Sequence, residues 1–248
     1  MRTANPVLSE RIFERYLQEE GGVARMTVGG TVVKSLSLVG ILLVPAIWMW
    51  TKFVGTGVQT GAVVPWAIGG AVGGLVLCLV TCFKQNWAPV TAPLYAAFEG
   101  LFVGAISAIF NVMYPGIVLP AIAITFGIFL AMLLLYTSRT IRATPALTKG
   151  IIIATFGVAL TYLMSWILAM FGTTIPMIHE GGTVGIIFSL VVIGIAAFNF
   201  ILDFDLIEQG AAQGAPKYME WYGGFALLVT LIWLYIEVLR LLAKLQRR

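Results

Sequence analysis

Acidic side chains lie inside or at the ends of strongly apolar stretches of this sequence. The four that stand out are Glu99, Asp203, Asp205 and Glu237. An ionised side chain near the centre of a lipid bilayer costs at least about 2.5–3.5 kcal/mol, so each of these residues would need a polar partner or a path for water. Carboxyl groups in such places can hold a proton, share a hydrogen bond or bind a cation.

The sequence FNFILDFDLIEQG concentrates four oxygen-bearing side chains: Asn199, Asp203, Asp205 and Glu208. Asn199 and Asp203 are four residues apart and share a helix face, whereas Asp205 and Glu208 are three apart on another face. Carboxylate and carbonyl oxygens are the ligands that calcium prefers. The pattern indicates either a calcium site at the mouth of a membrane span, with Asp203 and Asp205 as ligands, or a solvated helix end.

Glu237 lies in LYIEVLRLLAKL, about two turns before the end of the last apolar stretch. Arg240 follows three residues later and can form an ion pair within the same helix. The pair is either a local salt bridge at the interface or part of a functional site. Thr230, near the centre of the same stretch, could offer only a hydroxyl.

Glu99, in APLYAAFEGLFVGAIS, lies near the middle of another apolar stretch. Gly100 and Gly104 beside it allow a neighbouring helix to approach closely. Glu99 is then either a neutral, hydrogen-bonded acid that locks two helices together or a member of a site.

The composition indicates which elements must position these side chains. Hydrophobic residues make up 60% of the 248 residues and charged residues 10%, against roughly 25% charged residues in a soluble domain. Seven apolar segments are long enough to cross about 30 Å of hydrocarbon. We place them at Thr31–Trp50, Val63–Phe83, Val90–Val112, Gly116–Tyr136, Gly150–Phe171, Thr183–Asp203 and Trp221–Leu242. The sequence therefore predicts an all-α, polytopic membrane protein with short connections.

The rest of the chain divides into two short segments around this bundle of residues 31–242. Residues 1–30 lack the apolar region of a signal peptide, so we expect them to stay on the chain as a cytoplasmic segment. Their sequence SERIFERYLQEE is either an amphipathic helix on the membrane or the bundle, or a solvated leader. Residues 243–248 form a basic tail.

Lysine and arginine residues predict the orientation of the bundle. Among the loops, ten lie on the side of the N-terminus against Lys52 on the other side, so we expect the N-terminus to be cytoplasmic even though a full crossing by the last segment places Arg240, Lys244, Arg247 and Arg248 outside. The ten are Arg2, Arg11, Arg15, Arg25, Lys34, Lys84, Arg139, Arg142, Lys149 and Lys217. The last segment either re-enters the membrane or crosses it fully and places the basic tail outside, and we expect the full crossing.

Other features favour packing over catalysis. Cys78 and Cys82 lie in an apolar run with no His or acid nearby, and the single His179 cannot build a site alone. Two glycine pairs at four-residue spacing predict close helix contacts: Gly69 with Gly73, and Gly70 with Gly74. The sequence has no phosphate loop, nucleophile elbow, zinc-protease motif or nucleic-acid module. We therefore expect no enzymatic activity, no cofactor and no nucleic-acid partner.

The order of several motifs resembles a known family. These motifs are MTVGGTVVKSLSLVGI, YAAFEGLFVGAIS, FNFILDFDLIEQG and APKYMEWYGGFALLVTLIWLYIEVLRLL. Together they resemble the bacterial branch of the Bax inhibitor family, the transmembrane BAX-inhibitor-motif proteins. The resemblance implies a seven-helix bundle with the last helix near its centre. It also implies a pH-sensitive calcium leak gated by a pair of acids on the last two helices.

Carried over to this sequence, the resemblance places the first acid of the pair at Asp203 and gives Asp205 in place of a glutamine. Thr230 falls where the second acid usually lies. Glu237, seven residues later on nearly the same helix face, or Glu99 could then take the place of the missing acid.

These observations lead to two hypotheses of different classes. The first is a pH-sensitive calcium or cation leak channel of a bacterial inner membrane, gated chiefly by Asp203, because two carboxyls at close range cannot easily both ionise. In it, Asp205, Glu237 and Glu99 support the gate. The alternative is a non-conducting regulator that binds a membrane protease or another membrane complex. A proton-coupled carrier is a weaker third candidate, since the sequence shows no inverted repeat.

Overall fold

The computed structural model describes residues 25–53, 60–172 and 182–247. Its long helices are α2 (Val28–Phe53), α3 (Val64–Phe83), α4 (Ala88–Met113), α5 (Val118–Thr137), α6 (Pro145–Met170), α8 (Thr183–Ala212) and α9 (Met219–Gln246). Two short 3-10 turns, η1 (Thr60–Ala62) and η2 (Gln85–Trp87), precede α3 and α4. All seven helices are long and apolar enough to cross a membrane, which confirms the predicted fold class. The expected amphipathic segment within residues 1–24 and the lone His179 lie outside the described residues.

Local sequence sets several helix ends. Pro145 opens α6, and the hydroxyl of Thr144 before it accepts a hydrogen bond from the backbone N–H of Leu147 at 3.3 Å. After α8, Gly214 adopts a positive φ of 68°, a conformation that glycine tolerates best. Residues 213–218 between α8 and α9 therefore form a short turn. Helix α8 continues past Asp203 to Ala212, and α9 continues to Gln246, so Lys244 of the expected tail is helical.

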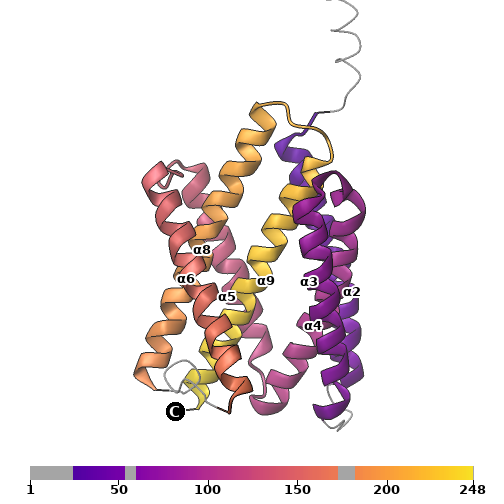
Figure 1. Cartoon of the computed structure of the whole chain (residues 1–248), viewed down its shortest axis with the longest axis vertical. Helices are drawn as coiled ribbons and strands as arrows, with labels where there is room; N and C mark the ends of the chain where they lie inside the picture. The colour runs from indigo at the N-terminus through magenta and orange to yellow at the C-terminus, as the bar shows by residue number, and fades with distance from the viewer. Residues whose placement is uncertain (1–24, 54–59, 173–181, 248) are drawn as a thin grey trace, which may run out of the picture.

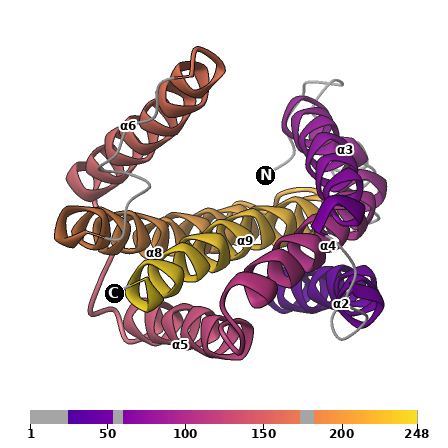
Figure 2. The same cartoon turned by 90° about the horizontal axis from the view of Figure 1, so that it is seen from below.

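The last two helices form the middle of the bundle. Figure 2 shows α8 and α9 side by side, with α2, α3 and α4 to one side and α5 and α6 to the other. Helix α9 is the most buried of the seven and packs against α8, α2, α4 and α5. The prediction that the last helix lies near the centre is confirmed.

Glycines allow close helix contacts around this centre. A Cβ added at Gly104 of α4 would lie 2.7 Å from the carbonyl oxygen of Ala46 in α2. A Cβ added at Gly70 of α3 would lie 2.7 Å from the backbone nitrogen of Phe102 in α4. Gly73 and Gly74 also face α4, but Gly69 has nothing within 4 Å, so its expected packing role is wrong.

The two ends of the described chain lie on opposite sides of the bundle. In Figure 1, α2 begins at the upper end and α9 finishes at the lower end, where C marks the terminus. The last helix therefore crosses the bundle fully and does not turn back. We call the end where α2 begins the N-terminal side and the end where α9 finishes the C-terminal side.

Candidate functional site

Asp203 and Thr230 meet where α8 packs on α9. The Thr230 hydroxyl donates a hydrogen bond to Oδ2 of Asp203 at 2.6 Å, and Thr230 is buried. The contact joins the two positions that the resemblance assigns to the paired acids. A hydroxyl donor thus occupies the place expected for the second carboxyl.

The polar neighbours of Asp203 on α8 have partners other than α9. The Asn199 amide donates to the Thr155 hydroxyl of α6 at 2.9 Å and to the carbonyl of Ile195 at 2.8 Å. Asp205 accepts a hydrogen bond at 2.6 Å from Gln209 on its own helix. Asp203 therefore reaches α9, whereas Asn199 reaches α6 and Asp205 stays on α8.

Glu208 ties α8 to the end of α5. It pairs with Arg139 at 2.5 Å and accepts a hydrogen bond from the Tyr136 hydroxyl. The neighbouring Glu208 carboxylate raises the pKa of the Arg139 guanidinium, which keeps that residue charged. Both partners of this ion pair are well exposed, so the pair contributes to stability only the small amount typical of a surface salt bridge.

The residues that the structure describes contain no group of three or more His, Cys, Asp or Glu side chains arranged to hold a metal ion. In particular, Asp203 and Asp205 engage different partners and do not converge on one point. A tightly bound calcium ion between them, which the sequence pattern suggested as one alternative, would lack the six to eight oxygen ligands that calcium takes.

Glu99 is buried between α3 and α4, as expected for an acid near the middle of a span. Its carboxylate lies against Gly74, where an added Cβ would meet it. Glu99 therefore contacts α3, on the side of the bundle away from α8, and is not brought to Asp203.

Glu237 is also buried, with 1% of its surface exposed, but it lies closer to the C-terminal side than Thr230. Its two oxygens accept hydrogen bonds from the Tyr162 hydroxyl of α6, each at 2.9 Å. Arg240 completes the group with a 3.0 Å ion pair to Glu237, and its guanidinium lies 4.8 Å from the centre of the Tyr162 ring. The expected pair with Arg240 is present within α9, and the contacts of Tyr162 with both residues tie α6 to α9.

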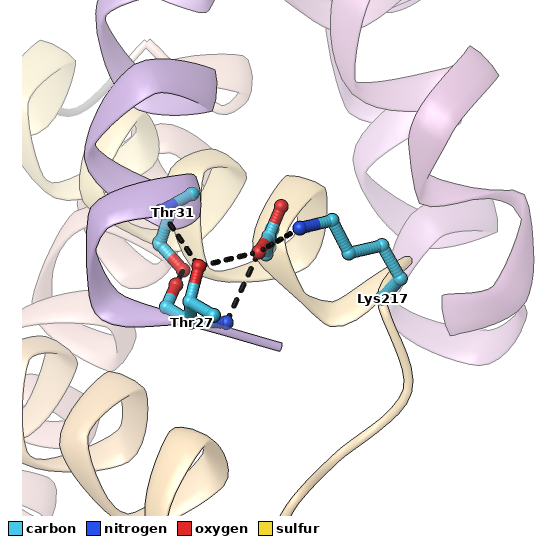
Figure 3. A network of polar contacts seen from close by, with 5 residues as sticks. Thr27, Thr31 and Lys217 are labelled. Carbon is cyan, nitrogen blue, oxygen red and sulfur yellow. Dashed lines mark hydrogen bonds and ion pairs between the residues drawn. The ribbon is translucent and has the colours of Figure 1, made fainter. Parts of the chain in front are cut away.

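Glu220, which no sequence pattern indicates as a site residue, is fully buried at the start of α9. Its Oε1 accepts hydrogen bonds from the Thr27 backbone N–H at 3.0 Å, the Thr27 hydroxyl at 2.9 Å and the Lys217 ammonium at 2.8 Å. Figure 3 shows Thr27 and Lys217 approaching this carboxylate from two sides. Its Oε2 is buried without a hydrogen-bond partner among the described residues.

Glu220 completes the N-terminal cap of α2. The Thr27 hydroxyl accepts a hydrogen bond from the Gly30 N–H at 2.9 Å, as in a capping box. The carboxylate that a capping box normally takes from the third helical residue comes here from α9, because Gly30 has no side chain. Glu220 thereby fastens α2 to α9 on the N-terminal side.

Lys244 was also missed as a site residue. It is 7% exposed, and its ammonium donates hydrogen bonds to the Ser189 hydroxyl at 2.8 Å and the Gly185 carbonyl at 3.0 Å, both on α8. Thr230, Glu237 and Lys244 follow one another at seven-residue spacing, a pattern that could have indicated a shared face of the last helix.

Comparison with known proteins identifies the family. The family model described as "Bax inhibitor 1 like" matches residues 5–247, which is nearly the whole chain. Searches of curated proteins and of solved structures found no match. The seven apolar helices, the central last helix and this match agree with the resemblance stated from the motifs. The chain belongs to the Bax inhibitor 1-like family of membrane proteins.

Proposed function

We propose that the chain is a pH-sensitive leak channel for calcium, closed by the contact between Asp203 and Thr230. The observation that supports this function best is the 2.6 Å hydrogen bond between α8 and α9, the two helices in the middle of the bundle. An ionisable side chain inside a helical bundle is by default a candidate for an ion or proton pathway. Membership of the family supports the same assignment.

The proposed gate responds to the charge of Asp203. A neutral carboxyl attracts no cation, and its contact with Thr230 then keeps α8 and α9 together. An ionised carboxylate can take calcium as a ligand in exchange for the Thr230 hydroxyl. Cation binding shifts such an equilibrium by the difference in its affinity for the two states, and a few kcal/mol are enough. We therefore expect the leak to rise with pH.

The other acids have supporting parts in this proposal. Asp205 lies beyond Asp203 toward the N-terminal side, where its negative charge concentrates cations at the mouth, whereas Glu208 is paired with Arg139 and holds α8 against the end of α5. Glu237 lies on the opposite side of Thr230 along α9 and continues the polar face. Glu99 supports the gate from α4 by fixing the packing of α3. Asp203 is the proposed calcium ligand within the path, with Asp205 as a peripheral one.

We place the channel in the inner membrane of a bacterium, with the N-terminal side in the cytoplasm. Lys84, Arg139, Arg142 and Lys217 lie in or beside the turns on that side, and such turns are typically cytoplasmic. The lipid bilayer is the surrounding partner, and calcium and protons are the ligands.

The test is calcium flux into liposomes that contain only the purified chain. A flux above that of protein-free liposomes, increasing between about pH 6 and 8, supports the channel, because carboxyls in proteins can titrate in this range. The alternative is a non-conducting regulator that acts through a membrane protease or another membrane complex. A chain that is folded in the liposomes and conducts no calcium at any pH would favour that regulator.

A further inference from the structure

A line of polar side chains continues from the gate to the C-terminal side of the bundle. On α9, Thr230, Glu237 and Lys244 are spaced by seven residues, so they lie on nearly one face, with a drift of about 20° per step. The line extends about 21 Å along the helix axis from Thr230 to Lys244. All three residues are buried.

Helix α8 packs along this face of α9, and the two helices keep the same pairing register at both ends of the line. Asp203 contacts Thr230, and Ser189 contacts Lys244. Asp203 and Ser189 are fourteen residues apart on α8, as Thr230 and Lys244 are on α9. Glu237 lies halfway between the two contacts along α9 and accepts a hydrogen bond from the Tyr162 hydroxyl of α6. Polar groups from α6, α8 and α9 thus form three separate contacts along one face of α9.

Lys244 occupies the end of this series as a buried cation. Its two hydrogen-bond acceptors, the Ser189 hydroxyl and the Gly185 carbonyl, are both neutral. No carboxylate lies within ion-pair distance of its ammonium in residues 25–53, 60–172 and 182–247. The nearest acid along its own helix face, Glu237, is already paired with Arg240. Burying an ammonium against neutral acceptors alone, as the described residues place Lys244, is costly and is unusual for a side chain with only a packing role.

The two acceptors of Lys244 are the kinds of oxygen that also bind a hard metal cation. Without the ammonium, this carbonyl and hydroxyl at the end of the line of polar side chains would be available to a permeating ion. The ammonium of Lys244 holds that position and adds a fixed positive charge, which repels calcium.

We propose that Lys244 is the resident cation that closes the C-terminal end of the path and limits its conductance for calcium. This role rests on the proposed channel function. It makes Lys244 a specificity-determining residue at a second closure, about 21 Å from the contact between Asp203 and Thr230.

The test compares Lys244→Gln with Lys244→Arg in liposomes that contain the purified chain. Glutamine can keep hydrogen bonds to Ser189 and Gly185 but removes the charge, so calcium flux should increase at least about tenfold as the repulsion is lost. Arginine keeps the charge, and its flux should stay within about twofold of wild type. A purely structural tether would give the opposite order, because arginine fits a lysine position in a tight contact less well than glutamine.

Each result decides the proposal. If wild type conducts and a folded Lys244→Gln variant conducts equally, Lys244 is not a closure, whereas the channel function stands. If neither conducts at any pH, the channel function itself fails. If Lys244→Gln does not fold, Ser189→Ala replaces it: loosening the ammonium should increase flux by about twofold or more, and an unchanged flux overturns the proposal.

Discussion

The Thr230 hydroxyl and the Asp203 carboxylate, 2.6 Å apart, join α9 to α8 through a contact that contains a single titratable group. The resemblance implied two acids at these positions, and two coupled acids lose their protons in two macroscopic steps. Threonine has no such proton to lose. A gate built on this contact should therefore follow the titration of Asp203 alone.

Thr230→Asp tests this difference. The variant places a second carboxyl against Asp203, so the pH dependence of calcium flux should change from one step to two. Thr230→Ser is the matched control, because it keeps a hydroxyl and should keep the single-step curve. A Thr230→Asp curve that superimposes on wild type would show that this contact does not set the pH response.

Gly30→Ala should weaken the attachment between α2 and α9. The added Cβ would meet the carboxylate of Glu220, so the Glu220 cap must move. We expect the free energy of unfolding in mixed micelles to fall by about 1–3 kcal/mol, the cost of disturbing a buried hydrogen-bonded carboxylate.

Gly29→Ala is the control for this change, since nothing lies within 4 Å of a Cβ at Gly29. It should be neutral or stabilise by up to about 1 kcal/mol, because alanine favours a helix more than glycine does. Equal effects of the two substitutions would argue against the cap that Glu220 supplies.

Tyr162→Phe removes the hydroxyl that α6 donates to Glu237 while the ring stays in place. The loss leaves a buried carboxylate with Arg240 as its remaining described partner, which should lower the free energy of unfolding by about 1–3 kcal/mol. In a Glu237→Gln background the same change should have a much smaller effect, and a double-mutant cycle measures the difference. Additive effects in that cycle would mean that the two residues are not coupled.

Reporters fused after Arg142, Gly172 and Arg247 test the proposed orientation. The first position lies on the N-terminal side and the other two on the C-terminal side, because α6 and α9 each cross the bundle. We expect the Arg142 fusion to be cytoplasmic and the other two to be outside. A cytoplasmic fusion at Arg247 combined with an outside fusion at Gly172 would contradict a full crossing by α9.

The seven spans could be predicted from the sequence because a bilayer requires long apolar helices with internally satisfied backbones. Their ends were less predictable. Helix α8 continues beyond its apolar stretch to Ala212. Asp205 and Glu208 lie in this continuation, where Glu208 pairs with Arg139. The charged residues that suggested the end of a span do not end the helix itself.

Sequence spacing can predict which candidate residues share a face of one helix, but not which residues meet across helices. Spacing along α9 predicts that Thr230 and Glu237 share nearly one face, and in the structure Thr230 contacts α8 whereas Glu237 contacts α6. The partner of Asp203 depends on the register of α8 against α9, which no local pattern sets. Glu220 was missed for the same reason, because its contact with Thr27 spans 193 positions in the sequence.

The most direct test of the proposed gate is the pH profile of calcium flux for wild type, Asp203→Asn and Asp205→Asn in liposomes. Asparagine at position 203 keeps an oxygen for Thr230 at nearly constant volume but cannot titrate, so the increase in flux between about pH 6 and 8 should flatten. Asp205, whose contact is with Gln209 on its own helix, should affect the profile much less. An Asp203→Asn variant that is folded and keeps the wild-type profile would contradict the central claim that Asp203 senses pH at the contact with Thr230.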